Sequence, residues 1–149
     1  YEKEITALGC KMSPQDEFNE LSFYTLSHNG GGYFIHQHAV DAFQAQTATA
    51  ETKSIGLAFG LIGLYLFLEK GYTGRQVQLA HVKLSKNKKP WPRLPLPEER
   101  GEITVSQVLA AAPGPARDEC IKSWCLSVWQ AYHTWHSAIA SFCQAELNA

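Results

Sequence analysis

The sequence lacks the cysteine pattern that would point to a disulfide framework. It has four cysteines, and none forms a C-x-x-C pair: Cys10, Cys120, Cys125 and Cys143. Cys120 and Cys125 are five residues apart, so on one helix their side chains point in different directions and cannot easily bond. We therefore predict reduced thiols in a cytoplasmic protein.

An excess of charge of one sign is also missing. The chain has 13 Lys and Arg against 14 Asp and Glu, a formal net charge of −1, which gives no overall attraction to nucleic acid or to an acidic membrane. Charged residues make up only 18% of the chain and hydrophobic residues 45%, so we predict a folded core and not disorder. A length of 149 residues predicts a single domain over 1–149.

No apolar run is long enough for a membrane span. The longest, residues 55–68, reads IGLAFGLIGLYLFL and covers ~21 Å as a helix, short of the roughly 20 residues that a bilayer core needs. We predict a buried helix and no membrane association. The first twelve residues, YEKEITALGCKM, contain no apolar stretch typical of a signal peptide, so we expect no secretory leader.

Strand patterns are missing as well, and helical spacing of apolar residues takes their place. Ser13 followed by Pro14 is typical of a helix start, Thr73 and Thr104 are further N-cap candidates, and Gly71 is typical of a helix end. We expect Gly30–Gly32 to end the first helix. The other predicted helices cover about 34–46, 52–70, 73–86, 104–112 and 116–147.

These patterns predict an all-α fold, a bundle of four main helices with one or two short ones. A proline-rich connection, about 87–102, is expected to lay Trp91, Leu94 and Leu96 over the bundle. On the first helix, Phe18, Leu21 and Leu26 are predicted to face inward. Glycines at 56, 60 and 63 share one side of the apolar helix, where small residues let a neighbouring helix approach closely.

The candidates for chemistry are histidines and one aspartate. His36 and His38 diverge by about 200° on a helix, so they cannot both bind one ion. His36 is predicted on the apolar side and His38 at the opposite edge. His38 with Asp41, or His133 with His136, has a spacing that allows chelation.

We therefore predict a site between helices for a divalent metal such as zinc or iron, or for a small ligand. Its candidate residues are His36, His38, Asp41, His81, His133 and His136. One alternative is that these are hydrogen-bonded packing residues. Another is acid–base work by Asp41 with a histidine and without a metal. The motifs indicate no reaction.

Basic residues gather in the segment 70–93, and no acid lies between Glu69 and Glu98. The candidate anion-binding residues are Arg75, Lys83, Lys86, Lys88, Lys89 and Arg93. Beside Trp91 they form a candidate surface for anions or nucleic acid, although a solvated helix end carries the same pattern. The rival to a metal or ligand site is therefore a non-catalytic interaction module, either a homodimer or an anion-binding protein.

Several stretches, taken in order, resemble a bacterial family of small proteins labelled only as a domain of unknown function: HAVDAFQAQ, LIGLYLFLEKG, ITVSQVLAA and SWCLSVWQAYHTWH. The resemblance runs from about His36 to Phe142. Val40–Gln46 matches the family pattern V-D-A-[YF]-x-x-Q, and Trp129 with His136 matches its late W…H helix. Thr47 stands where the pattern has a second histidine. The resemblance implies no activity.

Overall fold

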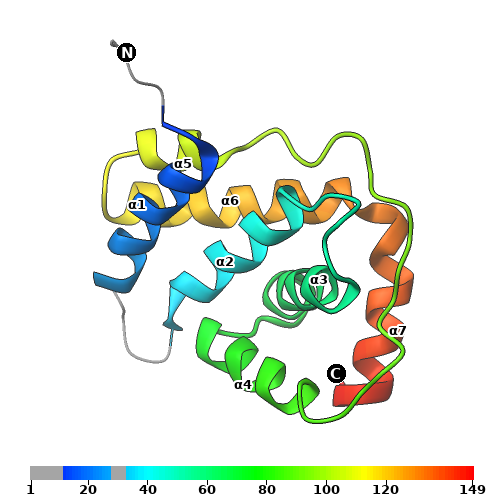
Figure 1. Cartoon of the computed structure of the whole chain (residues 1–149). Coiled ribbons are helices and arrows are strands. Elements are labelled where there is room, and N and C mark those ends of the chain that lie inside the picture. Colours follow the sequence, from blue (N-terminus) through cyan, green and yellow to red (C-terminus); the bar gives the residue numbers. More distant parts are fainter. Residues whose placement is uncertain (1–11, 28–32) are drawn as a thin grey trace.

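The computed structural model describes residues 12–27 and 33–149. Within these ranges the chain is helical and has no strand, which confirms the all-α class (Figure 1). The helices are α1 (Pro14–Ser27), α2 (Ile35–Gln46), α3 (Ser54–Lys70), α4 (Gly74–Leu84), α5 (Val105–Ala110), α6 (Pro115–Ala131) and α7 (His136–Leu147). Cys10 and the glycines expected to end the first helix lie outside the described residues.

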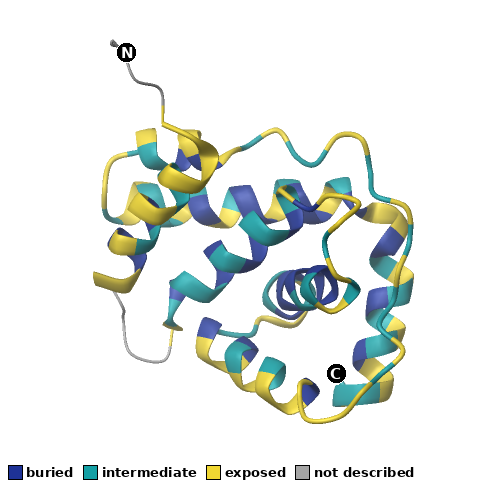
Figure 2. Cartoon of the chain, viewed as in Figure 1, coloured by how far each residue is buried: buried dark blue, intermediate teal, exposed yellow. Residues whose placement is uncertain are grey.

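Helix α3 occupies the centre of the molecule. It contacts α2, α4, α6 and α7, and Figure 1 shows it almost along its axis with these helices around it. Its residues are largely buried (Figure 2), so the apolar run is the core helix that its composition predicts. Within 12–27 and 33–149, no helix combines the length and the apolar character needed to cross a membrane.

Local signals determine where most helices begin and end. The Ser13 hydroxyl accepts the Asp16 N–H at 3.1 Å, as expected of an N-cap. Thr73 and Gln76 form a reciprocal capping box at the start of α4. Gly71 ends α3 with a φ of 72°, a left-handed conformation that glycine adopts without steric cost.

The glycine face of α3 is where α2 approaches most closely. A Cβ added to Gly60 would lie 3.1 Å from the Asp41 carbonyl oxygen, and one added to Gly63 would overlap the Asp41 carboxylate. This confirms the predicted role of these glycines in close packing. It also places the Asp41 side chain directly against the α3 backbone.

The prediction of one continuous helix over 116–147 is wrong. Helix α6 ends at Ala131, a 3-10 turn covers His133–Trp135, and α7 then runs in a new direction (Figure 1). A straight helix of that length would extend about 48 Å and would carry its second half away from the core. The bend instead returns Ile139 to the interior, where it is fully buried, and brings α7 against α3.

Two polar contacts hold the bend. The Tyr132 hydroxyl donates to the Ala45 carbonyl of α2 at 2.6 Å. The His136 ring Nε2 lies 2.7 Å from the Trp129 carbonyl. This is one of the last carbonyls of α6, for which the helix has no backbone N–H donor four residues later. Both contacts depend on residues that the break itself brings together.

Two further expectations concern how residues face the core. Leu21 is fully buried on α1 as predicted, but Leu26 is 52% exposed, because α1 lies at the edge of the molecule (Figure 1). The expectation for the proline-rich connection is confirmed, since Trp91, Leu94 and Leu96 pack against the core.

Candidate functional site

Two polar side chains of α2 are buried in the core. His38 and Asp41 are each 1% exposed, and their spacing of three residues places them on one side of the helix. In the part of the chain that the structure describes, three buried side-chain atoms have no hydrogen-bond partner, namely Nδ1 and Nε2 of His38 and Oδ2 of Asp41. Leaving a buried polar group unpaired costs roughly 1–3 kcal/mol, so this pair is not explained by packing alone.

The His38 ring lies between aromatic side chains. It stacks on Phe67 with ring centroids 3.6 Å apart and planes 11° apart, and Tyr33 meets its edge at 6.3 Å. Burial lowers the pKa of His38 from 6.5 to about 4, so the ring is neutral at pH 7. A neutral imidazole offers one N–H donor and one acceptor nitrogen, and nothing in the described protein uses either.

His38 lines a pocket of about 300 Å³, which we call the His38 pocket. It lies where the start of α2, the end of α3, the link between α3 and α4, and one side of α6 meet. Its lining residues are Tyr33, His38, Phe67, Leu68, Gly71, Tyr72, Thr73 and Lys122. This volume is at the lower end of the range of small-molecule sites.

Asp41 lies beside this pocket and does not line it. Its Oδ1 accepts a hydrogen bond from Gln37 Nε2 at 3.1 Å, and its Oδ2 faces Gly63. Burial raises the pKa of Asp41 well above 3.8, and the hydrogen bond from Gln37 opposes this only in part.

Burial and the neighbouring Asp41 also raise the pKa of the Cys125 thiol, which donates to the His38 carbonyl at 3.5 Å. Cys125 is therefore a packed thiol and not an activated nucleophile.

His36 and His81 are each bonded inside the protein. His36 Nδ1 lies 2.9 Å from the Thr25 hydroxyl, and the ring is half-buried, so the predicted order of burial of His36 and His38 is wrong. His81 Nε2 lies 2.9 Å from the Phe59 carbonyl, and its ring stacks on Phe59. Burial lowers the pKa of His36, and lowers that of His81 to about 4.

The bend after α6 separates the two late histidines. His136 stacks on Trp129 with ring centroids 3.9 Å apart and bonds to the Trp129 carbonyl, whereas His133 is exposed in the 3-10 turn. They do not share the face of one helix that their predicted chelation assumed. Within 12–27 and 33–149, no group of three or more His, Cys, Asp or Glu is placed to hold a metal ion, so the six predicted ligands are not brought together as one set.

Half of the predicted anion-binding residues are engaged in contacts within the protein. The Arg75 guanidinium lies over the Phe34 ring at 5.1 Å. Lys89 pairs with Glu146 at 3.7 Å, and Arg93 donates to the Thr52 carbonyl at 2.9 Å. The other three, Lys83, Lys86 and Lys88, are exposed.

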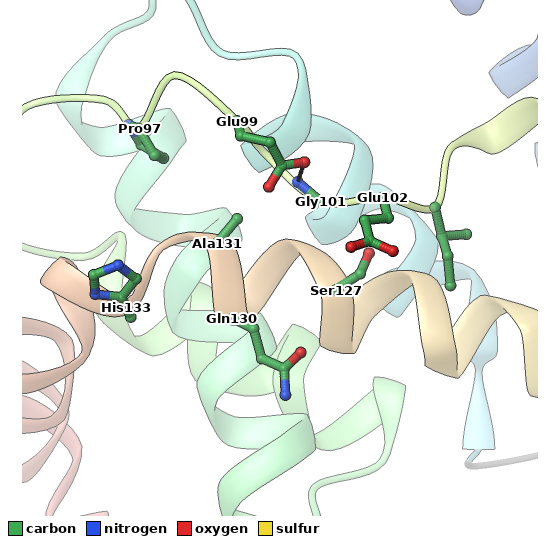
Figure 3. Close-up of a pocket in the computed structure, with 9 residues that line it drawn as sticks. Pro97, Glu99, Gly101, Glu102, Ser127, Gln130, Ala131 and His133 are labelled. Atoms are coloured by element: carbon green, nitrogen blue, oxygen red, sulfur yellow. Dashed lines mark hydrogen bonds between the residues drawn. The ribbon is translucent and has the colours of Figure 1, made fainter.

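A second pocket, of about 580 Å³, lies between the connection that precedes α5 and the last turns of α6 (Figure 3). It is lined by Pro97, Glu99, Gly101, Glu102, Ile103, Ser127, Gln130, Ala131 and His133. The view shows His133 at one end and Glu102 beside Ser127 toward the other. The Glu99 carboxylate accepts the Gly101 N–H at 2.7 Å, so part of its charge is used to fix the loop.

Sequence reasoning found His38 but missed the other walls of its pocket. Tyr33 and Tyr72 belong to no motif, Phe67 lies in the stretch LIGLYLFLEKG but was given no role there, and Lys122 stands outside the basic segment. The available signals were Gly71, which was identified as a helix end, and Thr73, which was identified as a helix cap. Its place at the pocket depends on where α4 packs.

A family model described as a family of unknown function (DUF5946) matches residues 8–133. The matched region includes every residue that lines the His38 pocket and stops before α7. No curated protein and no solved structure matches the chain.

Proposed function

The chain belongs to DUF5946, a family of unknown function, and we propose that it binds a small organic molecule in the His38 pocket. One observation carries the proposal: the His38 ring is almost fully buried, lines a pocket, and has two nitrogens without a hydrogen-bond partner. A bound molecule supplies the acceptor and donor that the protein does not.

Packing needs alone do not account for a histidine at this position. A phenylalanine would stack on Phe67 as well and would leave no polar atom unpaired. The neutral ring is suited to recognition because it donates from one nitrogen and accepts at the other without carrying a charge into the core. The pocket walls add aromatic surface, as small-molecule sites usually do.

A zinc or iron site, the alternative to an organic ligand, has less support. His36, His81 and His136 are each held by a hydroxyl or a backbone carbonyl, and structural or catalytic zinc needs three or four protein ligands. Elemental analysis of protein purified without an affinity tag separates the two alternatives. Stoichiometric zinc or iron that is lost in Asp41→Asn would favour the metal; less than a tenth of an equivalent, unchanged after reconstitution, would favour the organic ligand.

The test of the small-molecule proposal is a fragment screen followed by protein-observed NMR with labelled histidine side chains. We expect some fragments at millimolar concentration to shift the His38 ring signals and to lose binding in His38→Phe. His136→Phe is the matched control, because it also replaces a stacked histidine but lies away from the pocket. If no fragment shifts the His38 signals, or if His38→Phe binds them equally well, the proposal is wrong.

The rival function is a non-catalytic interaction module, either a homodimer or a polyanion-binding protein. Its support is the exposure of Lys83, Lys86 and Lys88 near the end of α4. The other three predicted anion-binding residues, Arg75, Lys89 and Arg93, each make a contact within the protein. We also propose a cytoplasmic location, since the described cysteines are free thiols.

A further inference from the structure

The residues that line the His38 pocket carry charge of one sign. Lys122 contributes an ammonium group from the exposed face of α6, and no Asp or Glu is among the lining residues. Asp41, the acid of α2, lies outside the lining, and burial raises its pKa well above 3.8. The lining itself holds no acidic side chain, while burial and, from outside the lining, Asp118 and Glu119 of α6 raise the pKa of Tyr33.

The start of α4 adds positive potential at the same place. Thr73, its N-cap residue, lines the pocket. The capping box uses the Gln76 N–H, and the Val77 N–H bonds to the Thr73 carbonyl at 3.0 Å. Thr73 thus brings the N-terminus of an 11-residue helix to the pocket, and at such an end the aligned peptide dipoles are equivalent to roughly half a positive charge.

A helix end alone is not a site, but His38 is an independent observation in the same pocket. Its ring is 1% exposed and both nitrogens lack partners. A neutral imidazole can donate one N–H to an anionic oxygen without adding a charge of its own. Lys122, the N-terminus of α4 and His38 thus converge on one volume from three different helices.

The remaining walls are apolar or aromatic. They are formed by Tyr33, Phe67, Leu68 and Tyr72, which suit a compact ring or a short aliphatic body. Such a body has room in about 300 Å³.

We propose that the ligand of the His38 pocket is a small organic anion whose carboxylate or phosphate group binds between Lys122, the N-terminus of α4 and His38, with its apolar body against the aromatic walls. This inference rests on the proposed function, because it assigns a ligand class to the same pocket.

The test uses four probes of similar size: benzoate, phenyl phosphate, benzyl alcohol as the neutral comparison, and inorganic phosphate as the anion without a body. Dissociation constants are measured by NMR titration at constant ionic strength. We expect benzoate or phenyl phosphate to bind the parent at least five-fold more tightly than benzyl alcohol. The stronger of the two identifies the anionic group, and inorganic phosphate is expected to bind more weakly than phenyl phosphate.

The matched variants are Lys122→Gln and Lys83→Gln, which each remove one exposed lysine. We expect Lys122→Gln to remove the preference for the anions and Lys83→Gln to keep it. If benzyl alcohol binds at His38 as tightly as the anions, or if Lys122→Gln keeps their preference, the inference is overturned while the pocket's ligand-binding function stands. If none of the probes shifts the His38 signals, both are overturned.

Discussion

Asp41 is the residue at which charge and burial conflict most directly. Its raised pKa means that the folded protein keeps the carboxyl group protonated at a pH where the unfolded chain has already lost the proton. By linkage, Asp41 lowers the free energy of unfolding increasingly as pH rises from about 4 toward its folded pKa. Below that window both states are protonated, and the effect disappears.

The first prediction is that Asp41→Asn gains stability relative to the parent as pH rises. Asn has the same shape and does not titrate, so the difference in the free energy of unfolding should grow by up to about 1.4 kcal/mol per pH unit above pH 4. Urea denaturation at pH 5, 6 and 7 measures it. Glu98→Gln, an exposed site, is the control and should run parallel to the parent. A pH-independent difference for Asp41→Asn would contradict the prediction.

The second prediction compares two histidines, His38 and His81, whose pKa values are both lowered to about 4. The unfolded chain binds protons at these residues near pH 6.5 and the folded protein only near pH 4, so stability is lost as pH falls between these values, by about 3 kcal/mol for each histidine. His38→Phe and His81→Phe should each remove the part of this loss of stability that comes from the replaced histidine.

At pH 7 the two variants should differ. His81→Phe loses the hydrogen bond to the Phe59 carbonyl and should unfold more easily by roughly 1 kcal/mol. His38→Phe keeps the stacking on Phe67 and loses no hydrogen bond within the protein, so its melting temperature should be equal to or above that of the parent. Equal destabilisation of both variants would mean that the His38 ring has a structural partner.

At the scale of elements, the glycines of α3 let α2 approach closely, and Gly63 is the one that faces the Asp41 carboxylate. A Cβ on Gly63 would overlap the Asp41 carboxylate, whereas a Cβ on Gly56 would meet only the flexible end of Gln44, 2.8 Å away. We predict that Gly63→Ala costs roughly 1–3 kcal/mol because the helices must separate. Gly56→Ala should be near neutral, since alanine also favours the helix by roughly 0.5–1 kcal/mol.

A double-mutant cycle ties this cost to Asp41. In an Asp41→Ala background the overlapping atoms are gone, so Gly63→Ala should cost much less than it does in the parent. Thermal or urea unfolding of the four proteins measures the coupling free energy. Additive effects would show that Gly63 is required for some reason other than the carboxylate.

The bend between α6 and α7 gives the second prediction at this scale. Tyr132→Phe removes the hydroxyl that donates to the Ala45 carbonyl and leaves that buried acceptor unpaired, so it should cost roughly 1–3 kcal/mol in the free energy of unfolding. Tyr65→Phe is the control, because it also removes a tyrosine hydroxyl, while the Tyr65 ring packs near Trp129 and its hydroxyl makes no hydrogen bond to the described residues. A Tyr132→Phe variant as stable as the control would mean that apolar packing alone holds the bend.

At the scale of the whole molecule, the formal net charge is only −1. Any polyanion binding must therefore come from local clusters of basic residues. Reversal of Lys86 and Lys88 to glutamate tests the rival function without disturbing the Lys89–Glu146 pair. A matched pair of single reversals, Lys86→Glu and Lys53→Glu, changes the net charge equally at two exposed sites, of which only the first lies in the basic segment. If the basic segment binds polyanions, Lys86→Glu should elute from heparin at lower salt than Lys53→Glu. Equal elution of the two variants would leave the segment as a solvated surface.

The sequence by itself determined most of the helices and most of their ends, but not the break between α6 and α7. Caps such as Ser13 and Thr73, and the glycine at 71, act through hydrogen bonds and backbone angles within a few residues, so the information is local. Composition also identified α3 as the core helix, because only a buried helix is apolar on all sides. The sequence likewise indicated that another helix packs closely on the glycine face of α3, but it did not indicate which side chain lies against that face.

The tertiary structure alone decided the site. Helical spacing places His36 and His38 on nearly opposite sides but cannot say which side another helix covers, and burial by α3 and α6 selected His38. The same packing set Asp41 against Gly63 and turned the chain at Tyr132, whose hydroxyl bonds to an α2 carbonyl 87 residues away in the sequence. The His38 pocket joins Tyr33, Phe67, Thr73 and Lys122 from separate elements. Their proximity results from the packing of whole helices, and no short stretch of sequence contains it.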